Sequence, residues 1–432
     1  MEGMSMEALL LRARGLAVLR GVLDSPVARD FLGLMGLLTV GRPEPAAVAG
    51  VFGRLWEGLA SEPDRMLPDA WQSHLVGRLL DHENPFSLGA ERGEMEWSVL
   101  HQAKRDLGTL RALFGLDART LLARVEDAVP ALAETWVPWT APVHEGDASP
   151  RSALARGLAA AGDWGKQAED LANHFARHGA GIFGRHRAFR WEGAGLRAVP
   201  GPDPIRLDGL VAYEREREPL VENTRRFLAG LPAHNALLYG QPGTGKSSTV
   251  KALLNEYADR GLRLVEVAKE DLGSLPRVLG LLRGRGPRFV LFVDDLSFEE
   301  HEVEYKALKA LLEGSVEEPP GNVRVYATSN RRNLVRESFS ERDGADDVHA
   351  RDTEQEKQSL AARFGLRVTF PAPDQWRYLE IVAGLARKRG LKLPEEELRE
   401  RALLWDRWHA GRSGRTARQF VDELAAGLLG GR

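Results

Sequence analysis

Two different periodicities divide the chain, and they predict two kinds of structure. In the first part, apolar residues recur every three or four positions, which is typical of helices that pack by one face. Helices are expected within residues 4–40, with a break at Ser25-Pro26, and at 46–59, 68–80, 94–114, 118–132 and 151–177. Residues 82–93, rich in Asn, Pro and Gly, are expected to form a loop, and 180–191 a short strand or hairpin. We therefore predict a mostly α-helical N-terminal domain at residues 1–198.

The clearest linker in the chain follows this part. The stretch Val199-Pro200-Gly201-Pro202-Asp203-Pro204 contains three prolines and a glycine, which interrupt helices and central strands alike. We therefore place a linker at residues 199–206 and expect a second domain to begin at residue 207.

After the linker, short apolar runs of strand length alternate with helical patterns. Strands are predicted at 236–239, 263–267, 288–293, 323–328 and 366–370, and helices at 247–257, 272–283, 301–312 and 352–364. This alternation is typical of a parallel α/β sheet with helices on both faces. Helices are also expected at 374–389, 394–409 and 416–428, with no strands between them. We therefore predict an α/β core at 207–372 and a helical subdomain at 373–432.

Composition narrows the chemistry that the chain can perform. Its 432 residues include eleven histidines without metal-ligand spacing and no cysteine, which excludes disulfides, thiolate metal sites and thiol catalysis. The net charge of −3 gives no overall argument for nucleic-acid binding. The first residues lack the pattern of a signal peptide, and no apolar run is long enough to cross a bilayer. We expect a cytoplasmic protein without a membrane partner.

Residues 240–247, Gly-Gln-Pro-Gly-Thr-Gly-Lys-Ser, match a phosphate-binding pattern. They follow a predicted strand and precede a predicted helix, which is the order that such a loop requires. The glycines allow successive N–H groups to turn toward phosphate oxygens, and the helix start adds its positive dipole end. Lys246 can contact the β- and γ-phosphates, and the Ser247 hydroxyl can bind Mg²⁺. The predicted nucleotide-binding residues of this loop are Gly240, Gln241, Pro242, Gly243, Thr244, Gly245, Lys246, Ser247 and Ser248.

Polar residues end two of the predicted strands. Asp294 and Asp295 follow the apolar run 289–293, and Asn330 follows Thr328-Ser329. Ligands of an open parallel sheet bind beyond the carboxyl ends of its strands, so these side chains are expected beside the phosphate-binding loop. There Asp294 would hold Mg²⁺, Asp295 would orient or polarise the attacking water, and Asn330 would contact the γ-phosphate or that water. Each could instead cap a strand or form a turn, as Asp and Asn often do.

The order of these motifs resembles the AAA+ ATPases. From about residue 207 onward, the chain is more narrowly similar to an uncharacterised bacterial family of predicted AAA+ ATPases, known only as a domain of unknown function. The similar stretches are 222–230, 294–299, 305–309, 326–332, 362–366 and 413–420, within about half of the chain. The resemblance implies an α/β P-loop NTPase (AAA+) core with a C-terminal helical lid that uses ATP and Mg²⁺. The N-terminal part carries no such resemblance.

The resemblance also implies roles for four individual residues. Asn330 resembles the residue that senses the γ-phosphate. Arg363 stands where AAA+ proteins carry an arginine finger into a neighbouring subunit's site, which implies a homo-oligomer; otherwise it is a helix-terminal arginine that favours the dipole. Arg418, or alternatively Arg415, resembles the lid arginine that contacts the γ-phosphate.

The segment before the core has an implied role as well. Leu210, Val211 and Tyr213 resemble the residues that line the adenine pocket, although they could equally pack the linker onto the core. The mixed-charge stretch 336–351 is given no catalytic role and is a candidate intersubunit or partner contact.

One residue departs from the AAA+ pattern. The residue after the metal-binding aspartate is usually glutamate in these proteins, and here it is Asp295, which is one methylene shorter. Either the Asp295 carboxylate still reaches the attacking water, or Glu299 takes over the role of Asp295, or hydrolysis is slow.

Three functions follow from these observations. The first is an oligomeric Mg²⁺-dependent ATPase that remodels an unknown macromolecular partner, with a protein partner bound by the N-terminal domain. The second is an ATP-dependent binding switch with little or no turnover. The third is a DNA-associated loader or initiator, although no helix-turn-helix or zinc module supports a nucleic-acid partner. A small-molecule phosphotransferase fits least, because no acceptor site is visible.

Overall fold

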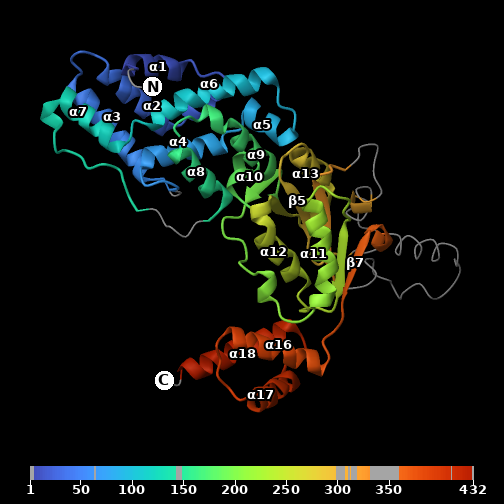
Figure 1. Ribbon diagram of the computed structural model, residues 1–432. Helices are drawn as coiled ribbons and strands as arrows, with labels where there is room; N and C mark the ends of the chain where they lie inside the picture. Colours follow the sequence, from blue (N-terminus) through green and yellow to red (C-terminus); the bar gives the residue numbers. More distant parts are fainter. Residues whose placement is uncertain are drawn as a thin grey trace. The chain divides into compact units, whose positions relative to one another are not determined.

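The computed structural model describes residues 4–62, 65–142, 148–297, 307–309, 312, 319–330, 360–409 and 411–430. They form two compact units (Figure 1). Unit 1 comprises Met1–Arg185 together with Gly284–Pro287, and unit 2 comprises His186–Arg283 and Arg288–Arg432. Among the described residues, we find no helix with both the length and the apolar character needed to cross a membrane.

Unit 1 is a helical assembly around one apolar core, which confirms the mostly helical prediction. Its α-helices are α1 (Met6–Arg14), α2 (Pro26–Leu38), α3 (Pro45–Ala60), α4 (Ala70–Asp81), α5 (Pro85–Arg92), α6 (Trp97–Phe114), α7 (Ala118–Ala128), α8 (Pro150–Ala160), α9 (Ala168–His178) and α10 (Gly181–Arg185). Each long helix contributes one apolar face, as its spacing predicts. Within this core the buried rings of Phe31 and Trp71 stack with centroids 3.5 Å apart.

Helix α5 contradicts the loop predicted at 82–93. Asn84 accepts hydrogen bonds from the N–H groups of Phe86 and Ser87, and the Ser87 hydroxyl accepts one from the Asn84 N–H, which forms a capping box. Pro85 occupies the first helical turn, and Gly93 ends the helix in the left-handed region (φ 71°). The prediction was wrong because the same residue types that mark loops also begin and end helices.

A chain of polar side chains, two of them buried, links three segments of unit 1. Nε2 of His74 lies 2.8 Å from Oγ of Ser25, and its Nδ1 lies 2.6 Å from Oε1 of Glu62. The order resembles a nucleophile, base and acid, but Ser25 is 9% exposed and its Oγ accepts the Ala28 N–H at the start of α2. The arrangement therefore caps a helix and satisfies a core histidine.

The segment Gly284–Pro287 belongs to unit 1 although its neighbours in sequence belong to unit 2. The Glu91 side chain, fully buried, accepts hydrogen bonds from Nε of Arg285 (2.8 Å) and from the N–H groups of Gly286 (2.8 Å) and Ala180 (2.9 Å). Nη2 of Arg285 also lies 2.8 Å from Oε1 of Glu83. A buried carboxylate is stable only with this kind of compensation, so the segment is fixed within unit 1.

Within the part of the chain that the structure describes, unit 2 is built on a seven-stranded sheet with the order β2-β1-β4-β5-β6-β3-β7. The strands are β1 (Ala188–Glu192), β2 (Gly195–Ala198), β3 (Ala236–Gly240), β4 (Leu262–Glu266), β5 (Arg288–Val293), β6 (Val323–Ser329) and β7 (Leu366–Phe370). All neighbours pair in parallel except β1 and β2, which form an antiparallel hairpin. The strands predicted from the apolar runs are confirmed, with β5 and β7 at their predicted bounds.

The hairpin changes where the second unit begins. Sequence analysis placed residues 186–198 in the helical domain and the linker at 199–206, whereas the two units divide between Arg185 and His186. Strand β1 pairs in parallel with β4, from Ala188 opposite Leu264 to Arg190 opposite Glu266, and so extends the sheet. A strand at a sheet edge depends on partners distant in sequence, which local patterns do not reveal.

The helices of unit 2 either lie beside the sheet or follow its last strand. They are α11 (Glu214–Leu228), α12 (Lys246–Tyr257), α13 (Leu275–Leu282) and, after β7, α16 (Gln375–Lys388), α17 (Glu395–Trp408) and α18 (Gly414–Gly430) (Figure 1). Apolar side chains of α11, α12, the strands and the three C-terminal helices share one buried cluster. Unit 2 therefore has the predicted layout, a mostly parallel α/β core followed by a helical subdomain, while the helices predicted at 301–312 and 352–364 lie mostly outside the described residues.

Candidate functional site

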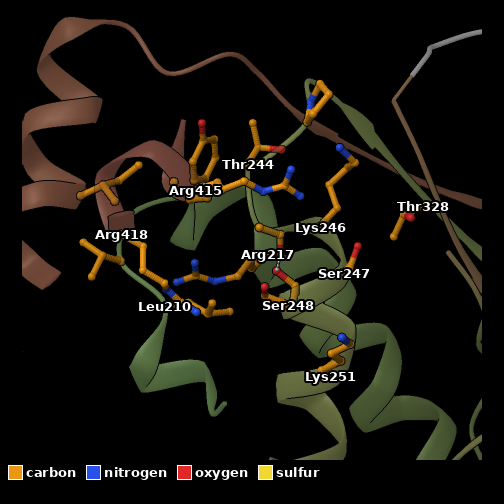
Figure 2. Close-up of a pocket in the computed structure, with 18 of the residues that line it drawn as sticks. Leu210, Arg217, Thr244, Lys246, Ser247, Ser248, Lys251, Thr328, Arg415 and Arg418 are labelled. Atoms are coloured by element: carbon orange, nitrogen blue, oxygen red, sulfur yellow. Dashed lines mark hydrogen bonds between the residues drawn. The ribbon is translucent and has the colours of Figure 1, made fainter. Parts of the chain in front are cut away.

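The ends of several elements of unit 2 surround one cavity of about 530 Å³ (Figure 2). Its volume lies within the usual range of small-molecule sites. The charged side chains that line it are Arg217, Lys246, Lys251, Asp294, Asp295, Arg415 and Arg418. Cations therefore outnumber carboxylates, which suits a polyanionic ligand.

The loop between β3 and α12 forms one wall of this cavity. Gly243 and Gly245 adopt φ values of 77° and 92°, which side chains disfavour, and α12 begins directly after them. A Cβ at Gly243 would also lie 3.0 Å from the Ser413 side chain. The wall thus combines close backbone approach with the N-terminal end of a helix, as an anion site requires.

Lys246 connects this loop to the neighbouring strand. Its Nζ donates hydrogen bonds to the carbonyl oxygens of Gly240 (2.8 Å) and Gln241 (2.9 Å) and to Oδ1 of Asn330 (3.0 Å). Burial lowers the pKa of the Lys246 ammonium, and the carboxylates of Asp295 and Asp294 oppose that shift. These three oxygen atoms thus hold the lysine at the cavity. A bound phosphate could replace them as hydrogen-bond acceptors of Nζ.

Ser247 and Asp294 meet where the metal site was predicted. The Ser247 hydroxyl donates to Oδ1 of Asp294 at 2.6 Å, and the Thr328 hydroxyl donates to the same oxygen. Hydroxyl and carboxylate oxygens are ligands that Mg²⁺ accepts when it completes its shell with water and phosphate. No cluster of three or more His, Cys, Asp or Glu side chains suited to a metal is found in the described part of the chain. The two oxygens therefore fit a metal that arrives with a phosphate ligand.

Asp295 and Asn330 form the other polar contact at the ends of the strands. Nδ2 of Asn330 donates to Oδ1 of Asp295 at 2.6 Å, so Asn330 bridges Asp295 and Lys246. Asp295 is exposed and has a left-handed backbone (φ 52°), which is uncommon for a residue other than glycine. Both predicted carboxylates line the cavity, together with Asn330.

The segment before α11 forms the opposite side. Leu210, Val211 and Tyr213 line the cavity, and Ala212 and Tyr213 both have positive φ values (60° and 64°). The buried guanidinium of Arg217 donates to the carbonyl of Ala212 and thereby supports this turn. Figure 2 shows Leu210, Arg217 and Arg418 on one side of the cavity and Lys246, Ser247 and Thr328 on the other.

The lid closes part of the same cavity. Arg415 and Arg418, both in α18 and both exposed, line it together with Ile381 and Leu385 of α16. The N–H of Gly414 donates to the carbonyl of Gly243 at 2.8 Å, which ties the start of α18 to the phosphate-binding loop. The structure brings both candidate lid arginines to the site.

Some predicted residues lie elsewhere. Gly240 and Gln241 do not line the cavity and instead accept hydrogen bonds from Lys246. Arg363 is half-buried just before β7 and is not among the described residues that line the cavity, so its role in a neighbouring subunit's site stays a prediction. Glu299 and the stretch 336–351 lie outside the described residues.

Sequence reasoning missed several lining residues. Thr328 was quoted only as part of the Thr-Ser-Asn stretch, and its contacts with Asp294 and Asp295 depend on the pairing of β5 with β6. Arg217 was not identified as a site residue, although it lines the cavity and is only 7% exposed. Lys251 also lines the cavity. The sequence did offer one signal: Arg217 lies three and four positions before Leu220 and Val221, which places it on the apolar face of the helix.

Part of the chain is similar to known proteins. The family described as "Protein of unknown function (DUF815)" matches residues 184–428, which is more than half of the chain. The proteasome-activating nucleotidase of Methanocella arvoryzae is 27% identical over 165 residues, which cover 33% of this chain and 40% of that protein. The replication factor C large subunit of Ignicoccus hospitalis is 34% identical over 80 residues, covering 17% of this chain and 16% of that protein.

A solved structure also matches part of the chain. The RuvB Holliday junction branch migration motor of Thermotoga maritima is 16% identical, with a TM-score of 0.36 over 52% of this chain and 67% of that one. The chain spans about two fifths of the length of the first curated relatives that it matches.

Proposed function

The chain belongs to the DUF815 family of AAA+ ATPases, and from this premise we propose that it binds Mg²⁺-ATP and hydrolyses it as an oligomer. The observation that carries the proposal is the convergence of three separate segments on one cavity. Lys246 and Ser247 are the first residues of α12, directly after the loop that follows β3, whereas Asp294 and Asp295 come from the end of β5 and Asn330 from the end of β6. In an open parallel sheet this edge is where ligands bind.

The residues divide into those that hold the nucleotide and those that act on it. Backbone N–H groups around Gly243 and Gly245, with Lys246, would hold the phosphates. Leu210, which Figure 2 shows on the other side of the cavity, would contact the adenine base, as would the lining residue Val211. Arg415 and Arg418 would reach the phosphates from the lid. Ser247 and Asp294 would hold Mg²⁺, which neutralises charge on the phosphates when it is bound.

Asp295 is the proposed base, with Asn330 as its hydrogen-bond partner. A carboxylate at this position can accept a proton from water or orient it, and Asn330 would keep the carboxylate facing the cavity. A neighbouring subunit's Arg363 would supply the guanidinium that stabilises the charge of the transferring phosphoryl group. Hydrolysis would drive a conformational change of the lid that acts on an unknown macromolecular partner. Unit 1 would bind this partner.

Steady-state phosphate release tests the proposal directly. Wild type, Asp295→Asn and Arg363→Ala are compared across protein concentrations with Mg²⁺-ATP, and Lys246→Ala serves as the variant that should lose ATP binding. Specific activity should rise with concentration, and both Asp295→Asn and Arg363→Ala should reduce kcat roughly 100-fold or more while ATP still binds. Release by Asp295→Asn at the wild-type rate would refute the assignment of the base.

A binding switch is the second candidate, and one observation favours it. Asp295 is one methylene shorter than glutamate, and its carboxylate already contacts Asn330 at 2.6 Å. If wild type binds ATP but releases no phosphate at any concentration, the switch replaces the ATPase as the better account.

A further inference from the structure

Thr328 contacts both carboxylate residues of the site. It lies in β6 and is 1% exposed. Its hydroxyl donates to Oδ1 of Asp294 at 2.5 Å and accepts the backbone N–H of Asp295 at 2.9 Å. Its carbonyl accepts the N–H of Leu296 at 2.7 Å. One residue of β6 therefore holds three consecutive residues that follow β5.

These bonds explain how two adjacent aspartates reach one cavity. Successive side chains of an extended strand point to opposite faces, so a regular continuation of β5 would turn Asp294 and Asp295 away from each other. Both nevertheless line the cavity. The left-handed backbone of Asp295 (φ 52°) breaks the alternation, and the hydrogen bond from its N–H to Thr328 stabilises this unfavourable conformation.

The same bonds give the two carboxylates different surroundings. Asp294 receives hydroxyl groups from Ser247 and Thr328 on one oxygen, whereas Asp295 receives the amide of Asn330. The first setting suits a metal ligand, and the second suits a group that orients water.

We propose that Thr328 is the positioning residue that lets an Asp-Asp pair serve this site, by fixing Asp294 toward Ser247 and the Asp295 backbone in its left-handed conformation. The inference rests on the proposed function and refines it. It accounts for the shorter side chain at Asp295, because the backbone turn brings the carboxylate into the cavity. A misplacement of about 1 Å in such a group costs roughly 100-fold in rate.

The test compares Thr328→Val, which keeps the shape and removes the hydroxyl, with Thr328→Ser, which keeps the hydroxyl. For each variant we would measure kcat, the Kd of ATP, the Mn²⁺ affinity of the ATP-bound protein by electron paramagnetic resonance, and thermal unfolding. Thr328→Val should lose roughly 10- to 100-fold in kcat and at least about threefold in Mn²⁺ affinity, with an unchanged Kd for ATP. Thr328→Ser should recover most of both.

The outcomes separate this inference from the proposed function. If wild type hydrolyses ATP and Thr328→Val keeps its kcat and Mn²⁺ affinity, the positioning role is overturned. If wild type releases no phosphate, the ATPase proposal fails, and the Mn²⁺ affinities alone decide the role of Thr328. If Thr328→Val does not fold, Thr328→Ser decides between the outcomes. The inference requires that Thr328→Ser keep nearly wild-type kcat and Mn²⁺ affinity. Losses in Thr328→Ser as large as those expected for Thr328→Val would contradict the inference.

Discussion

Gly384 offers a way to disturb the nucleotide site without changing a residue that lines it. It lies in the lid helix α16, where a Cβ would stand 2.5 Å from Cγ1 and 2.8 Å from Cγ2 of Val211. Carbon atoms of ordinary contacts lie about 3.5–4.0 Å apart, so Gly384→Ala must displace Val211 by about 1 Å. Val211 lines the cavity. The displacement should therefore reach the side of the cavity where we propose that the adenine ring binds.

The expected magnitude is a balance of two terms. Alanine favours a helix over glycine by about 1 kcal/mol, whereas an extra methyl group in a packed site costs about 1–3 kcal/mol. The net change in unfolding free energy for Gly384→Ala should thus lie between about 0 and 2 kcal/mol of destabilisation. Gly427→Ala is the matched control, since Gly427 is an exposed residue of α18 whose Cβ would meet nothing within 4 Å. It should gain about 1 kcal/mol.

Thermal unfolding measures the change in stability, and titration with a fluorescent ATP analogue measures the change in ATP affinity. Gly384→Ala should weaken ATP binding roughly 3- to 10-fold, which corresponds to about 0.7–1.4 kcal/mol, and Gly427→Ala should leave the affinity unchanged. If both variants stabilise the protein equally and bind ATP like wild type, Val211 moves freely and the reasoning about this contact is refuted.

Two further predictions concern buried polar groups. Glu91→Ala leaves the Arg285 guanidinium without its buried carboxylate and should lower the free energy of unfolding of unit 1, measured with urea, by about 3–5 kcal/mol. The control Glu83→Ala removes a carboxylate that is 41% exposed and should lower it by less than about 1 kcal/mol. Equal losses in the two variants would contradict the role of burial. Tyr326→Phe removes a buried hydroxyl that forms hydrogen bonds with two side chains of α11, and it should lower the free energy of unfolding by about 1–3 kcal/mol. The control Tyr239→Phe loses no hydrogen bond among the described residues and should change that free energy by less than about 0.5 kcal/mol.

Much of the core of unit 2 could be predicted because its strands are buried on both faces. Strands β5 and β6 are almost continuous runs of buried residues, and such runs are visible without knowledge of their partners. The hairpin of β1 and β2 was not placed in the sheet, because only its pairing with β4 distinguishes it from an isolated hairpin. Helix α5 was missed since its capping residues, Asn84 and Gly93, also occur in loops.

The candidate site shows the same division. Lys246, Ser247, Asp294 and Asn330 could be predicted because their spacing after strands carries a chemical meaning of its own. Thr328 could not, because its contacts depend on how the ends of two strands align and on a left-handed residue beside them. Local propensity contains no information about such contacts between segments distant in sequence.

The four residues Gly284–Pro287 limit how this architecture can be exchanged between proteins. They lie inside the stretch that matches the family, whereas Glu83 and Glu91, the carboxylates that hold Arg285, precede residue 184 and lie outside it. A chimera that joins a foreign N-terminal part at residue 185 would therefore keep an arginine whose buried partner is gone. Such a graft would have to supply its own carboxylates for Arg285 or replace the arginine, so the helical unit and this short segment have to be transferred together.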